Sequence, residues 1–156
     1  MRRPFKSQPD GVSVRLSTDE LAFLSGLPGL LAHVDQDPAD PAYARLHVAA
    51  YPDDPSAQAD LEEITGPDLA VERQSDRGGF LASLEHLDSD GGLLTPDEAE
   101  SWLTVLGDTR LALAARMGIT EPGREDAGEP ADPWQAALGF LAYLQAELVE
   151  ELMDRL

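Results

Sequence analysis

Three polar side chains near the middle of the sequence have the residue types and surroundings that suit binding of a carboxylate or another anion. Arg45 lies in the segment PAYARLHVAAY, while Asp108 and Arg110 lie in GDTRLALAAR, so all three have apolar neighbours. A guanidinium in such surroundings can hold a carboxylate through two parallel hydrogen bonds. We therefore expect these residues to form either a structural clamp within the protein or a binding site for an anion or a peptide terminus.

The sequence does not indicate a metal site or a cofactor. The histidines, His33, His47 and His86, form none of the HxH, HExxH or HxxxH pairs that commonly bind metals. The segment DSDGGLLTPDE at 88–98 has the oxygen atoms and glycines of a calcium loop, but its spacing does not match that motif. A glycine-rich turn followed by a helix cap explains the same residues.

No catalytic motif is assembled along the chain. The GxSxG segment of serine hydrolases, phosphate-binding glycine loops and the dinucleotide fingerprint are all absent from the sequence. There is no cysteine, which excludes thiolate and disulfide chemistry within these 156 residues. Carboxylates are so numerous that a pair for acid–base catalysis cannot be picked out, and we assign no catalytic residue.

The suspected residues Asp108 and Arg110 belong to a stretch with clear helix signals. Thr95 can cap the first turn, and Glu98 stands three residues later, at the capping-box spacing. Gly118 can end the helix in the left-handed conformation. Apolar residues recur between these limits at helical spacing, so we expect a largely buried central helix. The expected core residues of this helix and of the last helix are Trp102, Leu103, Leu106, Leu113, Leu138 and Leu141.

The last helix is expected to begin at Asp132-Pro133 and to carry an apolar face about six turns long. Such a face must pack on another element. The two candidates are the central helix and a second copy of the protein, so a homodimer through the last helix is one expectation.

Glycine and proline residues divide the rest of the chain into separate predicted elements. Gly26, Pro28 and Gly29 interrupt one helical pattern, and Gly66-Pro67 is expected to break another. The extended pieces that begin near Val12 and Gly92 each lead into a helix and can pair as a small ribbon. The predicted elements are a strand at 12–16, helices at 17–34, 41–47, 55–65, 68–87, 95–117 and 133–152.

These patterns predict a mainly α protein, an orthogonal helical bundle that can also carry a small two-stranded β-ribbon. Residues 1–11 are polar, basic and proline-containing, so we expect a mobile basic arm. Residues 12–156 are expected to form a single helical domain. Within it, the acidic segment at 120–131 is rich in glycine and proline and is predicted to be a loop.

The charge of the chain restricts its partners. The formal net charge is −19, and four of the eleven basic residues lie within the first 16 positions. The acidic remainder should repel nucleic acid and anionic membranes. A protein partner with a basic or apolar surface is favoured instead. No signal peptide or membrane-spanning run is visible, so we expect a cytoplasmic protein.

Two segments give the chain a family resemblance. RLHVAAYPDD followed by DLEEIT, and EAESWLTVLGDTRLALAARMGITE, resemble a mainly actinobacterial family of acidic helical proteins catalogued as a domain of unknown function. The resemblance covers most of residues 12–156. Members are often encoded near the Clp protease adaptor, which implies a link to regulated proteolysis. No catalytic residues are carried over from this family.

Two functions from different classes follow from these observations. The first is a non-enzymatic cytoplasmic protein-interaction module, favoured because no catalytic motif is assembled. The second is a small-ligand or anion-binding protein, or a hydrolase, with a pocket near Arg45 and Arg110.

Overall fold

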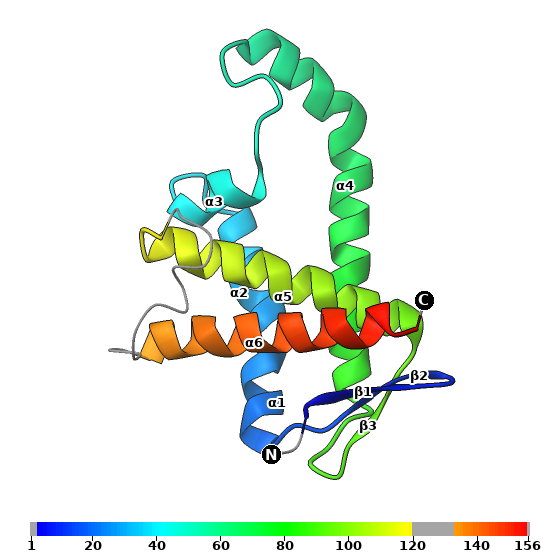
Figure 1. The fold of residues 1–156 in the computed structure, drawn as a ribbon. Helices are drawn as coiled ribbons and strands as arrows, with labels where there is room; N and C mark the ends of the chain where they lie inside the picture. Colours follow the sequence, from blue (N-terminus) through cyan, green and yellow to red (C-terminus); the bar gives the residue numbers. More distant parts are fainter. Residues whose placement is uncertain (1–2, 120–132, 156) are drawn as a thin grey trace.

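The protein is mainly α-helical, with a small antiparallel sheet at one end (Figure 1). The computed structural model describes residues 3–119 and 133–155; the predicted acidic loop at 120–131 therefore lies outside the described residues. The strands are β1 (Phe5–Gln8), β2 (Gly11–Val14) and β3 (Gly92–Leu94), and the helices are α1 (Thr18–Ser25), α2 (Leu27–Asp35), α3 (Pro41–Leu46), α4 (Pro55–Leu84), α5 (Pro96–Arg116) and α6 (Pro133–Met153).

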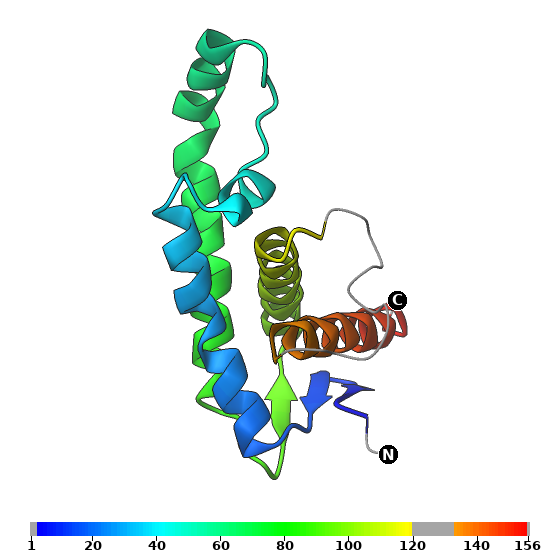
Figure 2. The ribbon, with the colours of Figure 1, turned by 90° about the vertical axis from the view of Figure 1, so that its left-hand side faces the viewer.

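Helix α5 is the central element, as the sequence predicts. It packs against α6, α3, α4 and α2 and also touches the sheet. Helices α5 and α6 lie side by side across α4, while α1 and α2 run along α4 (Figures 1 and 2). This arrangement buries α5 from several sides. The predicted core residues Trp102, Leu106, Leu113, Leu138 and Leu141 are buried, and Leu103 is partly buried.

The largest buried side chain, Trp102, joins three parts of the chain. Its ring packs edge-on against Phe5 of β1 at a centroid distance of 5.9 Å, and it packs in a tilted arrangement against Phe80 of α4 at 5.0 Å. Its indole N–H donates to the Ser83 hydroxyl at 2.7 Å. A buried indole needs such a partner because an unsatisfied N–H is costly. Trp102 thus ties the sheet and α4 to the central helix.

The predicted ribbon is present, and it has a third strand. β2 pairs with β3 in antiparallel fashion, with Val12 opposite Leu94. β1 pairs with β2 on the other edge, with Phe5 opposite Val14. The prediction of a mobile arm over residues 1–11 is therefore wrong for Phe5–Gln8. The reason is long-range: Phe5 is fully buried against Trp102, a contact that local composition does not reveal.

Helix α4 runs through the predicted break at Gly66-Pro67 as one helix of 30 residues. A proline inside a helix removes one backbone hydrogen bond and bends the helix. Here Pro67 is exposed, as is Glu63 one turn earlier, so water can reach the carbonyl that loses its partner. Figure 1 shows α4 bending towards its N-terminal end, which extends beyond the rest of the protein. The predicted interruption at Gly26, between α1 and α2, does occur.

We predict that Thr95→Ala lowers the free energy of unfolding by about 1 kcal/mol. The Thr95 hydroxyl accepts from the Glu98 N–H at 3.2 Å, and the Glu98 carboxylate accepts from the Thr95 N–H at 2.8 Å. The substitution removes the first of these bonds from the start of α5. Urea unfolding measures the loss; an unchanged midpoint would mean that the cap does not stabilise the helix.

None of the helices in the described ranges is both long enough and apolar enough to cross a membrane.

Candidate functional site: a polar network beneath an apolar hollow

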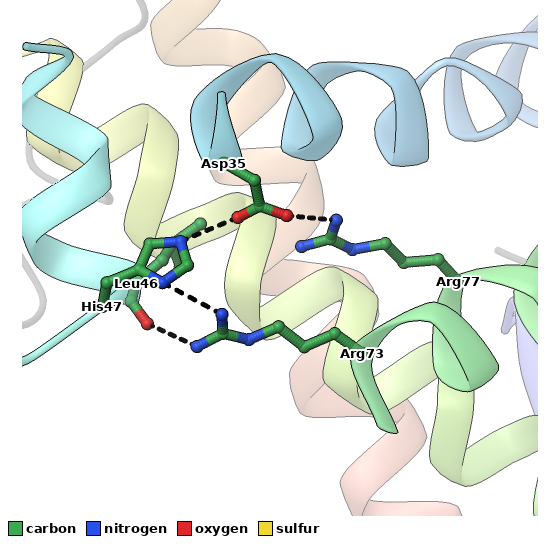
Figure 3. A network of polar contacts seen from close by, with 5 residues as sticks. All are labelled: Asp35, Leu46, His47, Arg73 and Arg77. Atoms are coloured by element: carbon green, nitrogen blue, oxygen red, sulfur yellow. Dashed lines mark hydrogen bonds and ion pairs between the residues drawn. The ribbon is translucent and has the colours of Figure 1, made fainter. Parts of the chain in front are cut away.

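A network of charged side chains joins the ends of α2 and α3 to the middle of α4 (Figure 3). Asp35 is the last residue of α2, and His47 follows the last residue of α3. Arg73 and Arg77 stand one turn apart on α4, so both side chains leave the helix on the same face. The network therefore connects three helices that are far apart in the sequence.

Each group in this network has a defined partner. One oxygen of Asp35 accepts from Arg77 at 2.6 Å, and the other lies 2.8 Å from Nε2 of His47. Arg73 lies 3.0 Å from Nδ1 of the same ring and also donates to the backbone carbonyl of Leu46 at 3.0 Å. The side chain of Arg77 is only 13% exposed and that of Asp35 27%, which makes these contacts stronger than surface ion pairs.

The contacts fix the protonation of the imidazole. A guanidinium only donates hydrogen bonds, so Nδ1 of His47 must accept from Arg73. The ring proton is then on Nε2, which donates to Asp35. His47 is neutral in this arrangement, and both of its nitrogens are engaged. The ring connects the other groups of the network and has no nitrogen left to act as a general base.

Two further carboxylates border the network from α4 and α5. Burial raises the pKa of Asp108, while the nearby positive charges of Arg77 and Arg73 oppose this effect and the negative charges of Asp76 and Asp35 add to it. Asp76 accepts from the Ser101 hydroxyl at 3.3 Å. With three carboxylates around two guanidinium groups, the network is rich in negative charge.

We predict that Asp108→Asn raises the free energy of unfolding at pH 7. A carboxyl group whose pKa is higher in the folded than in the unfolded state favours folding while protonated, and this contribution is lost as pH rises from about 3.8 through the folded-state value. Ionised Asp108 is therefore a net cost at neutral pH, and an amide of the same shape removes it. Urea unfolding at pH 7 and below pH 4 checks this: the gain should shrink at the acidic pH, and a less stable variant at pH 7 would contradict it.

A hollow of about 570 Å³ opens directly above the network. Arg73 and His47 lie at its base, and its walls come from α3, the connection that follows it, and the N-terminal half of α4. We call this feature the α4 hollow. Its lining residues are Tyr43, Leu46, His47, Val48, Ala50, Gln58, Leu61, Glu62, Thr65, Gly66, Leu69, Ala70 and Arg73.

The α4 hollow continues the face of α4 that packs on the body of the protein. Along this face, residues recur every three or four positions: Gln58, Glu62, Thr65, Leu69, Arg73, Asp76 and Phe80. Phe80 is fully buried, whereas Leu69 is 48% exposed and Val48, across the hollow, is 78% exposed. The same helical face thus changes from core at Phe80 to an exposed surface where α4 leaves the body, and on that surface Leu69 lies among polar residues.

The structure does not bring the three suspected polar residues together at one site. Arg45 is exposed on α3. Arg110 donates to Gln145 of α6, whereas Asp108 is close to the arginines of α4. Neither Arg45 nor Arg110 lines the α4 hollow.

A two-bond arginine–carboxylate clamp does exist, but it involves other residues. Arg116, near the end of α5, donates to both oxygens of Asp40, with the shortest contact at 2.7 Å. Asp40 also caps α3 by accepting from the Ala42 N–H. Hydrogen bonds from Arg116 and from Ala42 hold the pKa of Asp40 below its usual value. This pair fixes α3 against the central helix.

The residues of the network itself are not predicted by the sequence patterns described above. The available signal was the pair of arginines four positions apart, Arg73 and Arg77, which share one helical face. The predicted break at Gly66-Pro67 obscured the continuity of that face. Among the residues that the structure describes, no three histidines or carboxylates gather in a way that could hold a metal ion.

Comparison with known proteins identifies the family. A family model described as "Domain of unknown function (DUF2017)" matches residues 2–152. A protein of Mycobacterium leprae (strain TN), named "Putative oxidative stress regulator AosR", is 32% identical over 155 residues, which cover 89% of this chain and 70% of that protein. No solved structure matches the chain. A match to the family model over nearly the whole length shows that this chain belongs to the DUF2017 family.

Proposed function

We propose that this protein is a non-enzymatic regulatory module of the cytoplasm that binds another protein through the α4 hollow. The observation that carries the proposal is the group of apolar side chains in the α4 hollow: Val48 and Leu69 are 78% and 48% exposed, and Leu46 and Leu61 line the hollow beside them. Exposed apolar side chains that gather in one hollow often mark a contact with another molecule. The polar network supports this role because it fixes α3 and α4 on either side of the hollow.

The mycobacterial relative supports a regulatory role through its name. Regulation by direct contact suits the present chain, since the 156 residues contain no cysteine that could sense oxidants as a thiol. The engaged nitrogens of His47 also fit a structural rather than a catalytic network.

Site-specific photo-crosslinking in cells of the source organism tests the proposal. A photoreactive phenylalanine analogue at position 69 faces the hollow and should form adducts with a distinct protein. The matched control is position 71 on the same helix. Two residues correspond to about 200° around an α-helix, so this site faces away from the hollow. The control residue, Val71, is 69% exposed, so another protein can reach this position at least as easily as position 69.

Adducts to one partner from position 69, and few from position 71, would support the proposal. Equal adduct patterns at the two positions, or none at either, would contradict it. Adducts of the protein with itself would instead show that a second copy covers the hollow.

A further inference from the structure

We infer that the α4 hollow receives an amphipathic helix whose polar face carries lysine or arginine. This inference rests on the proposed function and specifies the chemistry of the partner. Three features support it: the apolar side chains that line the hollow, the acidic sequence of the stretch that forms it, and the pairing of the arginines in the network beside it.

The apolar floor suits a helix laid along α4. Leu61 and Leu69, about two turns apart on α4, line the hollow together with Leu46 of α3 and with Val48 of the segment that follows α3. A helix that binds in a groove inserts side chains spaced by three, four and seven residues. The volume of about 570 Å³ admits a few such side chains but not a folded domain.

The stretch of chain that forms most of the hollow is acidic in sequence. The sequence from position 46 to position 72 contains no lysine or arginine, and its only other basic side chain is His47. The acidic residues of the same stretch are Asp53, Asp54, Asp60, Glu62, Glu63, Asp68 and Glu72, and of these Glu62 lines the hollow. Complementary charge on the partner therefore means lysine or arginine beside its apolar residues, and like charge would be repelled.

The cationic groups at the base do not oppose such a partner. The guanidinium of Arg73 already donates to the ring of His47 and to the carbonyl of Leu46. Arg77 is paired with Asp35, and Asp108 lies close to both arginines. The positive charge of these arginines is thus compensated from within the protein, which leaves Glu62 in the lining to interact with a basic partner.

Fluorescence anisotropy with synthetic peptides tests the inference on the full chain. The probe is an 18-residue helix of leucine and lysine with its leucines on one face. A second peptide replaces every lysine by glutamate, and a third shuffles the lysine peptide so that no apolar face forms. We expect the amphipathic lysine peptide to bind at least ten times more tightly than either of the others.

Two variants locate the binding. Leu69→Gln should weaken the lysine peptide at least tenfold, whereas Val71→Gln, on the outer face of the same helix, should leave its affinity unchanged. Both residues are exposed, at 48% and 69%, so neither substitution opens the core, and a thermal melt confirms that each variant is folded. Glu62→Lys should also weaken binding, and raising the salt concentration should weaken it further.

Equal binding of the lysine peptide to the Leu69→Gln and Val71→Gln variants would overturn the inference, because it would mean attraction to the net acidic chain as a whole. Preference for the glutamate peptide would overturn it as well. Photo-crosslinks from position 69 without preference for the lysine peptide would refute this partner chemistry while leaving the proposed function intact. If position 69 gives no crosslinks to a partner and the lysine peptide is not preferred, both the proposed function and this partner chemistry are refuted.

Discussion

Replacing Trp102 with alanine should lower the free energy of unfolding by about 3 to 5 kcal/mol, the usual cost of removing a fully buried aromatic side chain. Trp102 has no exposed surface, packs against Phe5 and Phe80, and donates to the Ser83 hydroxyl. The substitution leaves a cavity between the sheet, α4 and α5. It also leaves a buried hydroxyl without one of its partners.

Chemical denaturation of the purified chain measures this effect. Trp134→Ala is the matched control because that side chain is 58% exposed, and its loss should be below about 1 kcal/mol. A loss below 1 kcal/mol for Trp102→Ala would show that the junction of the sheet, α4 and α5 is not the core of the fold.

The second large effect is expected at Asp35. Asp35→Ala removes the acceptor that pairs with Arg77 and orients His47. Breaking a fully buried ion pair costs about 3 to 5 kcal/mol, and we expect about 2 to 3 kcal/mol here because Asp35 retains 27% of its side-chain exposure. The matched control is Asp60→Ala on α4, which removes an exposed carboxylate and should change stability by less than about 0.5 kcal/mol.

The effect of Asp35 should depend on pH. Burial raises the pKa of Asp35, but hydrogen bonds from Arg77 and His47 and the positive charge of Arg77 outweigh it, and the net shift is downward from 3.8. A lowered folded-state pKa stabilises the protein above the unfolded value, and this stabilisation is lost as pH falls through the folded-state value. The difference between the native chain and Asp35→Ala should therefore be full at pH 7 and shrink below about pH 3.8. A difference that does not change with pH would contradict the role of the ionised carboxylate.

The parts of the fold that sequence predicts well are those with local causes. The start of α5 follows from Thr95 and Glu98, whose side chains reach only three residues along the chain. The break between α1 and α2 follows from Gly26 in the same way. β1 was missed because its stability depends on pairing with β2 and on the contact between Phe5 and Trp102, 97 positions apart.

The candidate site was missed for a related reason. Its network joins Asp35 and His47 to arginines that lie about 26 to 42 residues further on, and periodicity within one helix does not reveal such pairs. Arg45 and Arg110 attracted attention because their sequence neighbours are apolar, but only Arg110 has its interaction inside the helical bundle, with Gln145. The arginine–carboxylate pair that was expected at these positions is formed by Arg116 and Asp40 instead.

The central claim is that the apolar residues of the α4 hollow serve binding rather than folding. The most direct measurement takes the protein that crosslinks to position 69, purifies it, and determines its Kd for three forms of this chain. These are the native chain, the hollow variant Val48→Gln/Leu69→Gln, and the outer-face control Ile64→Gln/Val71→Gln, whose residues are 75% and 69% exposed. We predict that the hollow variant alone binds at least tenfold more weakly, a loss of about 1.4 kcal/mol in binding free energy. The free energy of unfolding of both variants should lie within about 1 kcal/mol of that of the native chain. Equal affinity of all three forms would contradict the claim.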